Sequence, residues 1–178
     1  ISDLIKIFVI NLFLLMLKKI LLLSDTHGYI DEKIISHTNY VDEVWHAGDI
    51  GNTRVIDSIK LLKPIKAVYG NIDSNEIRMM TEKNLIFESE GVRVVMTHIA
   101  GYPGRYNRSA IELIQKYNPN LFICGHSHIL KVIQDKKYNH LHFNPGAAGI
   151  YGFHKKRTML KFSLQKGTIK NLFVIELK

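Results

Sequence analysis

Seven side chains in this sequence have the chemistry and the order of a metal-binding set. Each follows a short apolar run, and they are Asp25, His27, Asp49, Asn71, His98, His126 and His128. Carboxylate, amide and imidazole donors of this kind suit Mn²⁺, iron, Zn²⁺ or Ni²⁺ better than Ca²⁺ or Mg²⁺. The ordered combination carries the signal, because Gly-Asp and Gly-Asn by themselves are common turn dipeptides.

Seven donors are too many for a single first-row ion. Two cations roughly 3.5–4 Å apart that share a bridging carboxylate would use all of them. Asp49 is the natural bridge, since a carboxylate can give one oxygen to each ion. The pairs Asp25-x-His27 and His126-x-His128 fit this scheme, because residues two apart at a strand end can point to the same side. The set therefore predicts two divalent ions.

The elements that must position these residues read as strands alternating with helices. Unbroken apolar runs, such as 20–23 and 92–96, are typical of strands buried on both faces. Segments 53–63 and 108–117 have apolar residues three and four apart, which predicts helices. The tail, 158–177, reads as a β-hairpin. We expect an α/β fold with two sheets, or one sheet with an antiparallel extension, whose strands bring the seven side chains to one carboxyl edge.

Composition narrows the class of protein. The chain has 178 residues, 46% of them apolar and 22% charged, which predicts one globular domain over 18–178. Its formal net charge of +8 favours an anionic substrate or partner. Cys124 is the only cysteine, which excludes an internal disulfide and a cysteine-built zinc site. We expect a cytoplasmic protein.

The first 17 residues form an apolar extension. Its apolar run, 7–17, is too short to span a bilayer comfortably. Lys18 and Lys19 follow the run rather than precede it, and no small-residue cleavage site comes before Ile20, which disfavours a signal peptide. We expect a start of synthesis at Met16, with a surface-packed extension or a membrane-directed segment as alternatives.

The ordered motifs resemble those of the calcineurin-like metallophosphoesterase superfamily, from Ile20 to the C-terminus. The Gly-Asn-Ile-Asp, Thr-His and Asn-Pro-Gly blocks are similar to the small YfcE-like phosphodiesterase branch. This resemblance implies a four-layer α/β/β/α sandwich, the metallo-dependent phosphatase fold. It also implies hydrolysis of a small phosphodiester by a hydroxide held between two ions, with Mn²⁺ as the activating metal, and it weakly favours a homo-oligomer.

Carried over by motif, the resemblance assigns the ligands to two ions. Asp25, His27 and His128 would hold one ion, Asn71, His98 and His126 would hold the other, and Asp49 would bridge them. Asp49 and Asn71 would thereby also be catalytic. A catalytic role for Asp73 in orienting the attacking group and a turn-capping role both stay open.

The chain departs from the family pattern at Ile72. In larger phosphatases of the superfamily a His follows Gly-Asn and stabilises charge or protonates the leaving group. Isoleucine cannot donate a proton, so expulsion of a poor leaving group should be slower by as much as roughly 10²–10⁴-fold. Many relatives also continue Thr-His with Gly-His, whereas Ile99 and Ala100 stand here.

Other residues have weaker interpretations. Arg105, in the turn-rich loop after His98, either contacts substrate phosphate or is a surface residue. Asn144 could line the phosphate cleft through its backbone. His46 either supports a ligand from behind or simply ends a strand. Four residues are assigned to the core or the surface: Cys124 and His142 are expected to pack inside, and His140 and His154 to be at the surface.

Two further functions are open. A non-catalytic binding scaffold, like the eukaryotic retromer subunit with this fold, is disfavoured because all seven ligand positions hold competent residues. A nucleic-acid-processing phosphodiesterase is suggested by the charge of +8. Clear interleaving of basic and aromatic residues is missing from the sequence, which argues against a nucleic-acid partner without excluding it.

Overall fold

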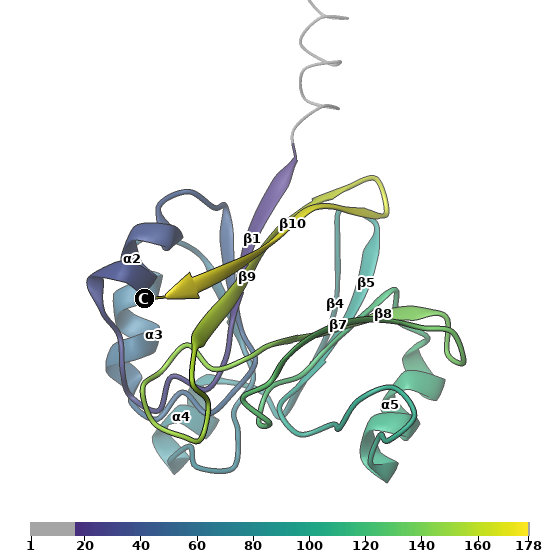
Figure 1. Cartoon of the computed structure of the whole chain (residues 1–178), viewed down its shortest axis with the longest axis horizontal. Helices are drawn as coiled ribbons and strands as arrows, with labels where there is room; N and C mark the ends of the chain where they lie inside the picture. Colours follow the sequence, from purple (N-terminus) through teal and green to yellow (C-terminus); the bar gives the residue numbers. More distant parts are fainter. Residues whose placement is uncertain (1–16, 178) are drawn as a thin grey trace, which may run out of the picture.

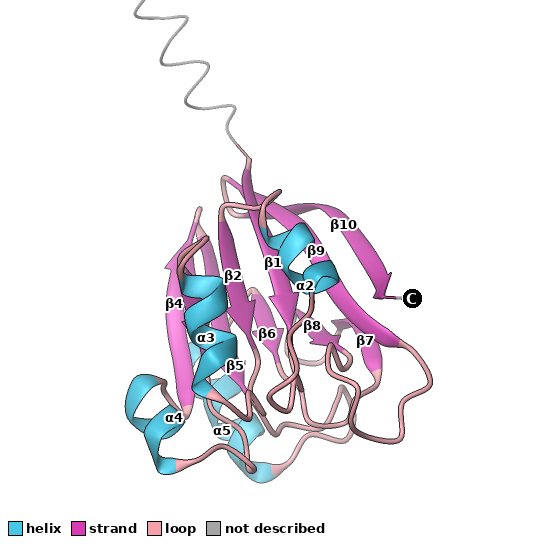
Figure 2. Cartoon of the chain, turned by 90° about the vertical axis from the view of Figure 1, so that its left-hand side faces the viewer, coloured by secondary structure: helices cyan, strands magenta, loops and turns pink. Residues whose placement is uncertain are grey.

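The computed structural model describes residues 17–177, which form two five-stranded sheets and four helices (Figures 1 and 2). The first sheet has the order β10-β9-β1-β2-β3, with β1 (Lys18–Leu23), β2 (Glu43–His46), β3 (Ile65–Ala67), β9 (Arg157–Gln165) and β10 (Thr168–Leu177). The second has the order β4-β5-β6-β8-β7, with β4 (Asn84–Ser89), β5 (Val92–Thr97), β6 (Leu121–Ile123), β7 (Leu130–Asp135) and β8 (His140–Pro145). The helices are α2 (Glu32–Thr38), α3 (Thr53–Lys60), α4 (Asn75–Met80) and α5 (Arg108–Tyr117).

Each sheet has a parallel centre. Strands β1, β2 and β3 run parallel to one another, and so do β5, β6 and β8. The antiparallel strands β4 and β7 form the edges of the second sheet. The terminal hairpin extends the first sheet, because β9 pairs antiparallel with β1. Two sheets therefore form, and the alternative of one extended sheet is wrong.

The layers explain the unbroken apolar runs. In β1, Ile20 and Leu22 face the second sheet and share a core with Trp45 and Phe143. Leu21 and Leu23 point the other way, into a second core under α2, α3 and α4. A third core lies between the second sheet and α5. Strands buried on both faces need apolar residues at every position, and the α/β/β/α arrangement is confirmed (Figure 1).

The predicted helices are present, with one difference in length. Segment 108–117 is α5, which starts after the N-cap Asn107 and ends at Asn118 in the left-handed conformation. Segment 53–63 is helical only to Lys60, and Leu61 beyond it is 86% exposed. Helices α2 and α4 and strands β4 and β7 were not predicted from the sequence.

The apolar extension lies almost entirely outside the described residues, so the expectations for it stay predictions. Within 17–177, no helix is long and apolar enough to cross a membrane.

Candidate metal centre

The seven predicted ligands come from the ends of strands in both sheets. Asp25, His27 and Asp49 follow β1 and β2, and Asn71 lies beyond β3, all in the first sheet. His98, His126 and His128 follow β5 and β6 in the second sheet. The expectation that all seven share the edge of one sheet is therefore wrong. The edges of two packed sheets meet there instead.

Backbone hydrogen bonds join the loops that carry these ligands. The N–H of His27 donates to the carbonyl of Asp49 at 3.0 Å, which ties the loops after β1 and β2 together. The N–H of Gly125 donates to the carbonyl of His98 at 3.0 Å, which does the same for the loops after β5 and β6. The backbone N–H of His126 donates to both carboxylate oxygens of Asp25, at 3.2 and 3.1 Å, and links the two sheets. Hydrogen bonds from backbone N–H groups therefore fix the positions of the loops that carry the ligands.

The first cluster consists of Asp25, His27 and His128, whose donor atoms all lie within 4.8 Å of one another. The Nε2 atoms of the two histidines are 3.2 Å apart, and Nε2 of His128 is 3.3 Å from Oδ1 of Asp25. Asp25 is fully buried. The nearby Asp25 carboxylate raises the pKa of His128. This cluster offers three donors to a single position.

The second cluster consists of Asp49, His98 and His126, again within 4.8 Å. Nε2 of His98 lies 3.2 Å from Oδ1 of Asp49. Nδ1 of His98 donates to the carbonyl of Ala47 at 2.8 Å, which leaves the lone pair on Nε2. That buried Nε2 has no hydrogen-bond partner within residues 17–177. An unpartnered imidazole nitrogen aimed at a carboxylate fits a metal ligand.

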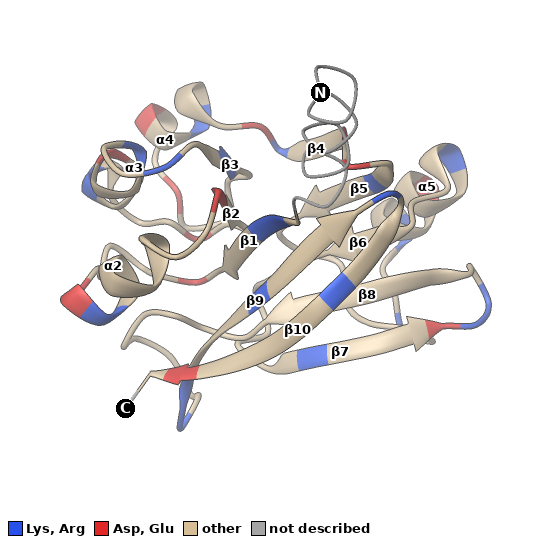
Figure 3. Ribbon diagram, turned by 90° about the horizontal axis from the view of Figure 1, so that it is seen from above, with Lys and Arg blue, Asp and Glu red and all other residues tan. Residues whose placement is uncertain are grey.

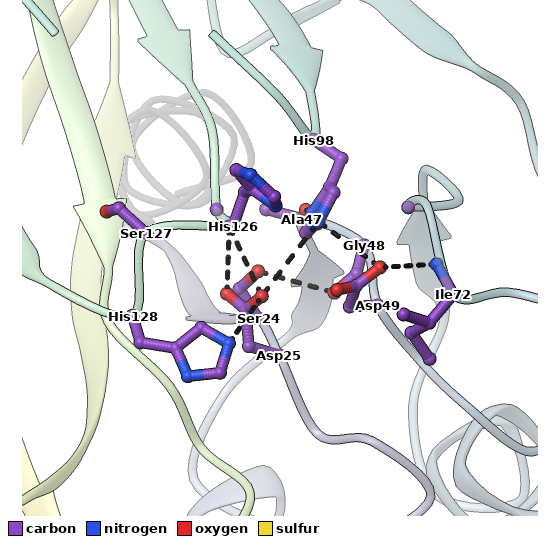
Figure 4. A network of polar contacts seen from close by, with 12 residues as sticks. Ser24, Asp25, Ala47, Gly48, Asp49, Ile72, His98, His126, Ser127 and His128 are labelled. Carbon is purple, nitrogen blue, oxygen red and sulfur yellow. Dashed lines mark hydrogen bonds and ion pairs between the residues drawn. The ribbon is translucent and has the colours of Figure 1, made fainter. Parts of the chain in front are cut away.

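Asp49 belongs to the second cluster and also approaches the first. Its Oδ1 approaches His98, and its Oδ2 is 3.8 Å from Nε2 of His27 in the first cluster. The backbone N–H of Ile72 donates to Oδ1 at 3.2 Å and fixes the carboxylate (Figure 4). Asn71 is exposed and lines the same cavity as His98, so its ligand role stays a prediction.

The pKa shifts of Asp49 and His98 show that the two clusters favour positive charge. Burial raises the pKa of Asp49, but His98 and the N–H of Ile72 outweigh burial and hold it below its usual value. Burial lowers the pKa of His98, but the contact with Asp49 and the charge of Asp25 outweigh it and raise the pKa. The donor set therefore fits divalent cations, which would take the place of the imidazolium charge.

Five of the seven residues have a backbone conformation that L-amino acids rarely adopt. The φ angles are 55° at Asp25, 49° at His27, 54° at Asp49, 68° at His126 and 57° at His128. Asp tolerates this left-handed region better than most residues, yet each case still costs free energy. Such strain gathers where a function needs a given side-chain direction. No sequence pattern revealed it.

Asp73 joins two loops of the site through its carboxylate. Its carboxylate accepts the N–H groups of Ile50, Gly51 and Gly70 at 3.1, 2.6 and 2.8 Å, and the residue is 4% exposed. These bonds connect the loop after Asp49 to the Gly-Asn loop. They support the turn-capping alternative, and a role of Asp73 in orienting an attacking group stays a prediction.

The two predicted substrate contacts, Asn144 and Arg105, stay predictions. Asn144 is buried, and its side chain donates to the carbonyl of Gly125 at 2.8 Å and to Oγ of Ser127 at 3.1 Å. It therefore shapes the Gly-His-Ser-His loop. Arg105 is exposed and is not among the residues that line the cavity beside His98.

His46 supports the site from behind, as one of its two interpretations predicts. It is fully buried, its Nδ1 accepts the N–H of Gly48 at 3.2 Å, and its Nε2 lies 2.9 Å from Oγ1 of Thr26. Burial lowers the pKa of His46 to about 4. The neutral ring thus holds the loops of Asp25 and Asp49 in place.

Two histidines that were expected at the surface, His140 and His154, are buried or partly buried. His140 is 1% exposed, and its Nε2 lies 3.0 Å from the hydroxyl of Tyr106. His142 packs in the core as predicted, against Phe122. His154 is partly buried and contacts His128 directly.

The contact between His154 and His128 sets the tautomers of both rings. Nε2 of His154 lies 3.0 Å from the carbonyl of Gly149, which only accepts, so Nε2 carries the proton. Nδ1 of His154 then accepts from Nδ1–H of His128 at 3.2 Å. The lone pair of His128 is left on Nε2, toward Asp25. No sequence pattern indicates this contact, because the two residues meet only through the fold.

Replacing His154 by alanine should weaken metal binding at the first cluster by about 10–100-fold, because His128 loses the partner that orients it. Calorimetric Mn²⁺ titration of EDTA-treated protein would measure this. His154→Gln, which can also donate to Gly149 and accept from His128, should recover part of the affinity. The equivalent change at His37 on α2 is the control. Unchanged affinity in His154→Ala would contradict the positioning role.

The sequence is similar to those of known metallophosphoesterases. The model of the calcineurin-like phosphoesterase superfamily domain matches residues 18–167. A probable metallophosphoesterase of Methanothermobacter thermautotrophicus is 28% identical over 111 residues, which span 60% of this chain and 64% of that protein. A probable metallophosphoesterase of Methanocaldococcus jannaschii is 26% identical over 86% of this chain and 80% of its own length.

A solved structure shows the same fold. Vps29 of Chaetomium thermophilum superposes with a TM-score of 0.68 at 14% identity, over 89% of this chain and 96% of that one. Identity this low supports the fold alone. The match of the family model over residues 18–167, with two histidine–carboxylate clusters inside it, places the chain in the calcineurin-like phosphoesterase superfamily.

Proposed function

We propose that this protein is a dinuclear metal-dependent phosphodiesterase. The observation that carries the proposal is the pair of three-residue clusters joined through Asp49, where the strand ends of two sheets meet. Asp25, His27 and His128 would hold one ion, and His98, His126 and Asn71 the other. When bound, the ions supply charge stabilisation to a phosphoryl group and lower the pKa of water.

The chain's own residues define what the site does besides holding metal. Ile72 orients Asp49 through its backbone, while its side chain is 46% exposed and has no proton to give. No acid at this position can protonate the leaving group. The site therefore favours substrates whose leaving group departs without protonation. Preference for diesters, activation by Mn²⁺ and assembly into homo-oligomers are proposed from the resemblance, and a cytoplasmic location is proposed from the composition.

Two alternatives have less support. A protein-binding scaffold of the Vps29 type shares the fold. A scaffold would not need a complete set of metal ligands, whereas this chain has two clusters of candidate ligands. For nucleic acid, basic residues would be expected to gather on one face. Figure 3 shows Lys and Arg spread over both sheets and the helices, with acidic residues among them.

Hydrolysis of bis-p-nitrophenyl phosphate beside p-nitrophenyl phosphate tests the proposal. EDTA-treated protein should be inactive, and Mn²⁺ should restore turnover with a higher kcat/KM for the diester. p-Nitrophenolate leaves without protonation, so the absence of an acid at Ile72 should not suppress either reaction. Preference for the monoester would make the protein a phosphatase. Folded protein without turnover in any divalent metal would support the scaffold.

A further inference from the structure

A cavity of about 660 Å³ opens from the second cluster toward α5. Asn71 and His98 line it together with Lys83, Lys116 and Tyr117. Of these five residues, only Asn71 and His98 have a proposed role as metal ligands.

The lining is cationic. Arg78, Lys83 and Lys116 contribute three positive charges, and none of them forms an ion pair with a carboxylate among residues 17–177. Glu112 is the one acidic residue of the lining, and it pairs with Arg108 at 3.0 Å. The cavity therefore has an excess of positive charge beyond the metal centre.

Arg78 is held in position beside the metal loop. Its Nε donates to the carbonyl of Asp73 at 2.9 Å, and one terminal nitrogen donates to the carbonyl of Asn71 at 3.4 Å. Its guanidinium also stacks on Tyr69, 5.0 Å from the ring centroid. A guanidinium fixed by its own loop loses little freedom when it meets an anion.

We propose that this cavity binds a second phosphate group of the substrate. The metal centre would take the scissile diester, and a neighbouring phosphate would lie among Arg78, Lys83 and Lys116. A phosphate offers oxygen acceptors for charge-assisted hydrogen bonds to all three cations, which a neutral ester group cannot do. The preferred substrates are then phosphodiesters that carry a further phosphate. This inference rests on the proposed function.

The thymidine dinucleotides TpT and pTpT test it, because they differ only by a terminal 5′-phosphate. NMR titration into EDTA-treated protein measures binding without turnover. pTpT should bind at least about tenfold more tightly, the change expected for one charge-assisted hydrogen bond. In the metal-loaded protein, kcat/KM should favour pTpT by a similar factor.

A charge-matched pair of variants locates the effect. Lys83→Ala with Lys116→Ala should bring the pTpT-to-TpT ratio of Kd clearly closer to one than in the wild-type protein, because only Arg78 of the three cations remains. Lys33→Ala with Lys60→Ala removes the same charge from exposed positions on α2 and α3, and should keep the wild-type ratio. Loss of the ratio in both variants would show long-range steering and overturn the site.

The experiments distinguish failure of the phosphate-site proposal from failure of the phosphodiesterase proposal. Equal binding of the two dinucleotides to the wild-type protein, or faster turnover of TpT than of pTpT, would overturn the cavity as a phosphate site. Hydrolysis of bis-p-nitrophenyl phosphate would then still support the phosphodiesterase. Tighter binding of pTpT in a protein that hydrolyses no diester would count against the phosphodiesterase and in favour of the cavity.

Discussion

Replacing Asp49 by asparagine should lower metal-dependent turnover on the order of 10³-fold or more while the protein stays folded. Asparagine keeps the shape of the side chain and an oxygen that can accept the N–H of Ile72. It loses the negative charge that lies between His27 and His98, and an amide cannot offer two equivalent anionic oxygens to two cations. Both clusters should therefore bind metal more weakly.

Three measurements on this variant separate the explanations. Metal content after dialysis reports binding, thermal unfolding reports the fold, and hydrolysis of bis-p-nitrophenyl phosphate reports function. Asp57→Asn is the matched control, because Asp57 is exposed on α3. If Asp49→Asn kept both ions and wild-type turnover, the bridging assignment would be wrong.

Replacing Gly70 by alanine should disrupt the site almost as strongly, although it adds only one methyl group. A Cβ at Gly70 would lie 2.0 Å from Oδ1 of Asp49 and 2.7 Å from Cδ2 of His98. It would also lie 2.5 Å from the backbone nitrogen of Asp49, which cannot turn away as a side chain can. The two ligands must therefore shift, and misplacement by about 1 Å can cost roughly 10²-fold in rate.

Stability should fall as well, by about 1–3 kcal/mol, the usual range for overpacking. Chemical denaturation measures this cost, and Mn²⁺ titration with diester hydrolysis measures the loss of the site. Gly104→Ala is the control, because a Cβ there meets nothing within 4 Å. Its φ of +86° should cost some stability, but activity should be kept. Wild-type turnover in Gly70→Ala would mean that the loop gives way without moving Asp49.

Much of the fold could be predicted because its signals are local. Strands buried on both faces read as unbroken apolar runs, and β1 shows why, since its alternate residues enter two different cores. Segment 108–117 has a helical period, an Asn at each end and no competing strand pattern, so α5 was predicted with its observed bounds. Short elements such as α4, with six residues, have too few positions to show a period.

The supporting residues could not be predicted, because side chains of the same type serve different purposes. Asp73 and Asp49 both follow a strand, yet Asp73 accepts three backbone N–H groups while Asp49 lies between the clusters. His154 was expected at the surface, but its ring contacts and orients His128. Which role applies depends on what the fold places opposite the side chain.

The sequence by itself determined the donor types and their positions at the ends of apolar runs, and with them a set of candidate ligands for divalent cations. That information is local, because a buried strand and the polar residue that ends it are neighbours in the chain. Only the tertiary structure decided that two sheets share the site, and that Asp25 meets the backbone of His126, 101 residues away. The cationic cavity beside His98 also forms only through the tertiary structure. Such contacts depend on how the sheets pack, because packing brings together residues that no sequence spacing relates.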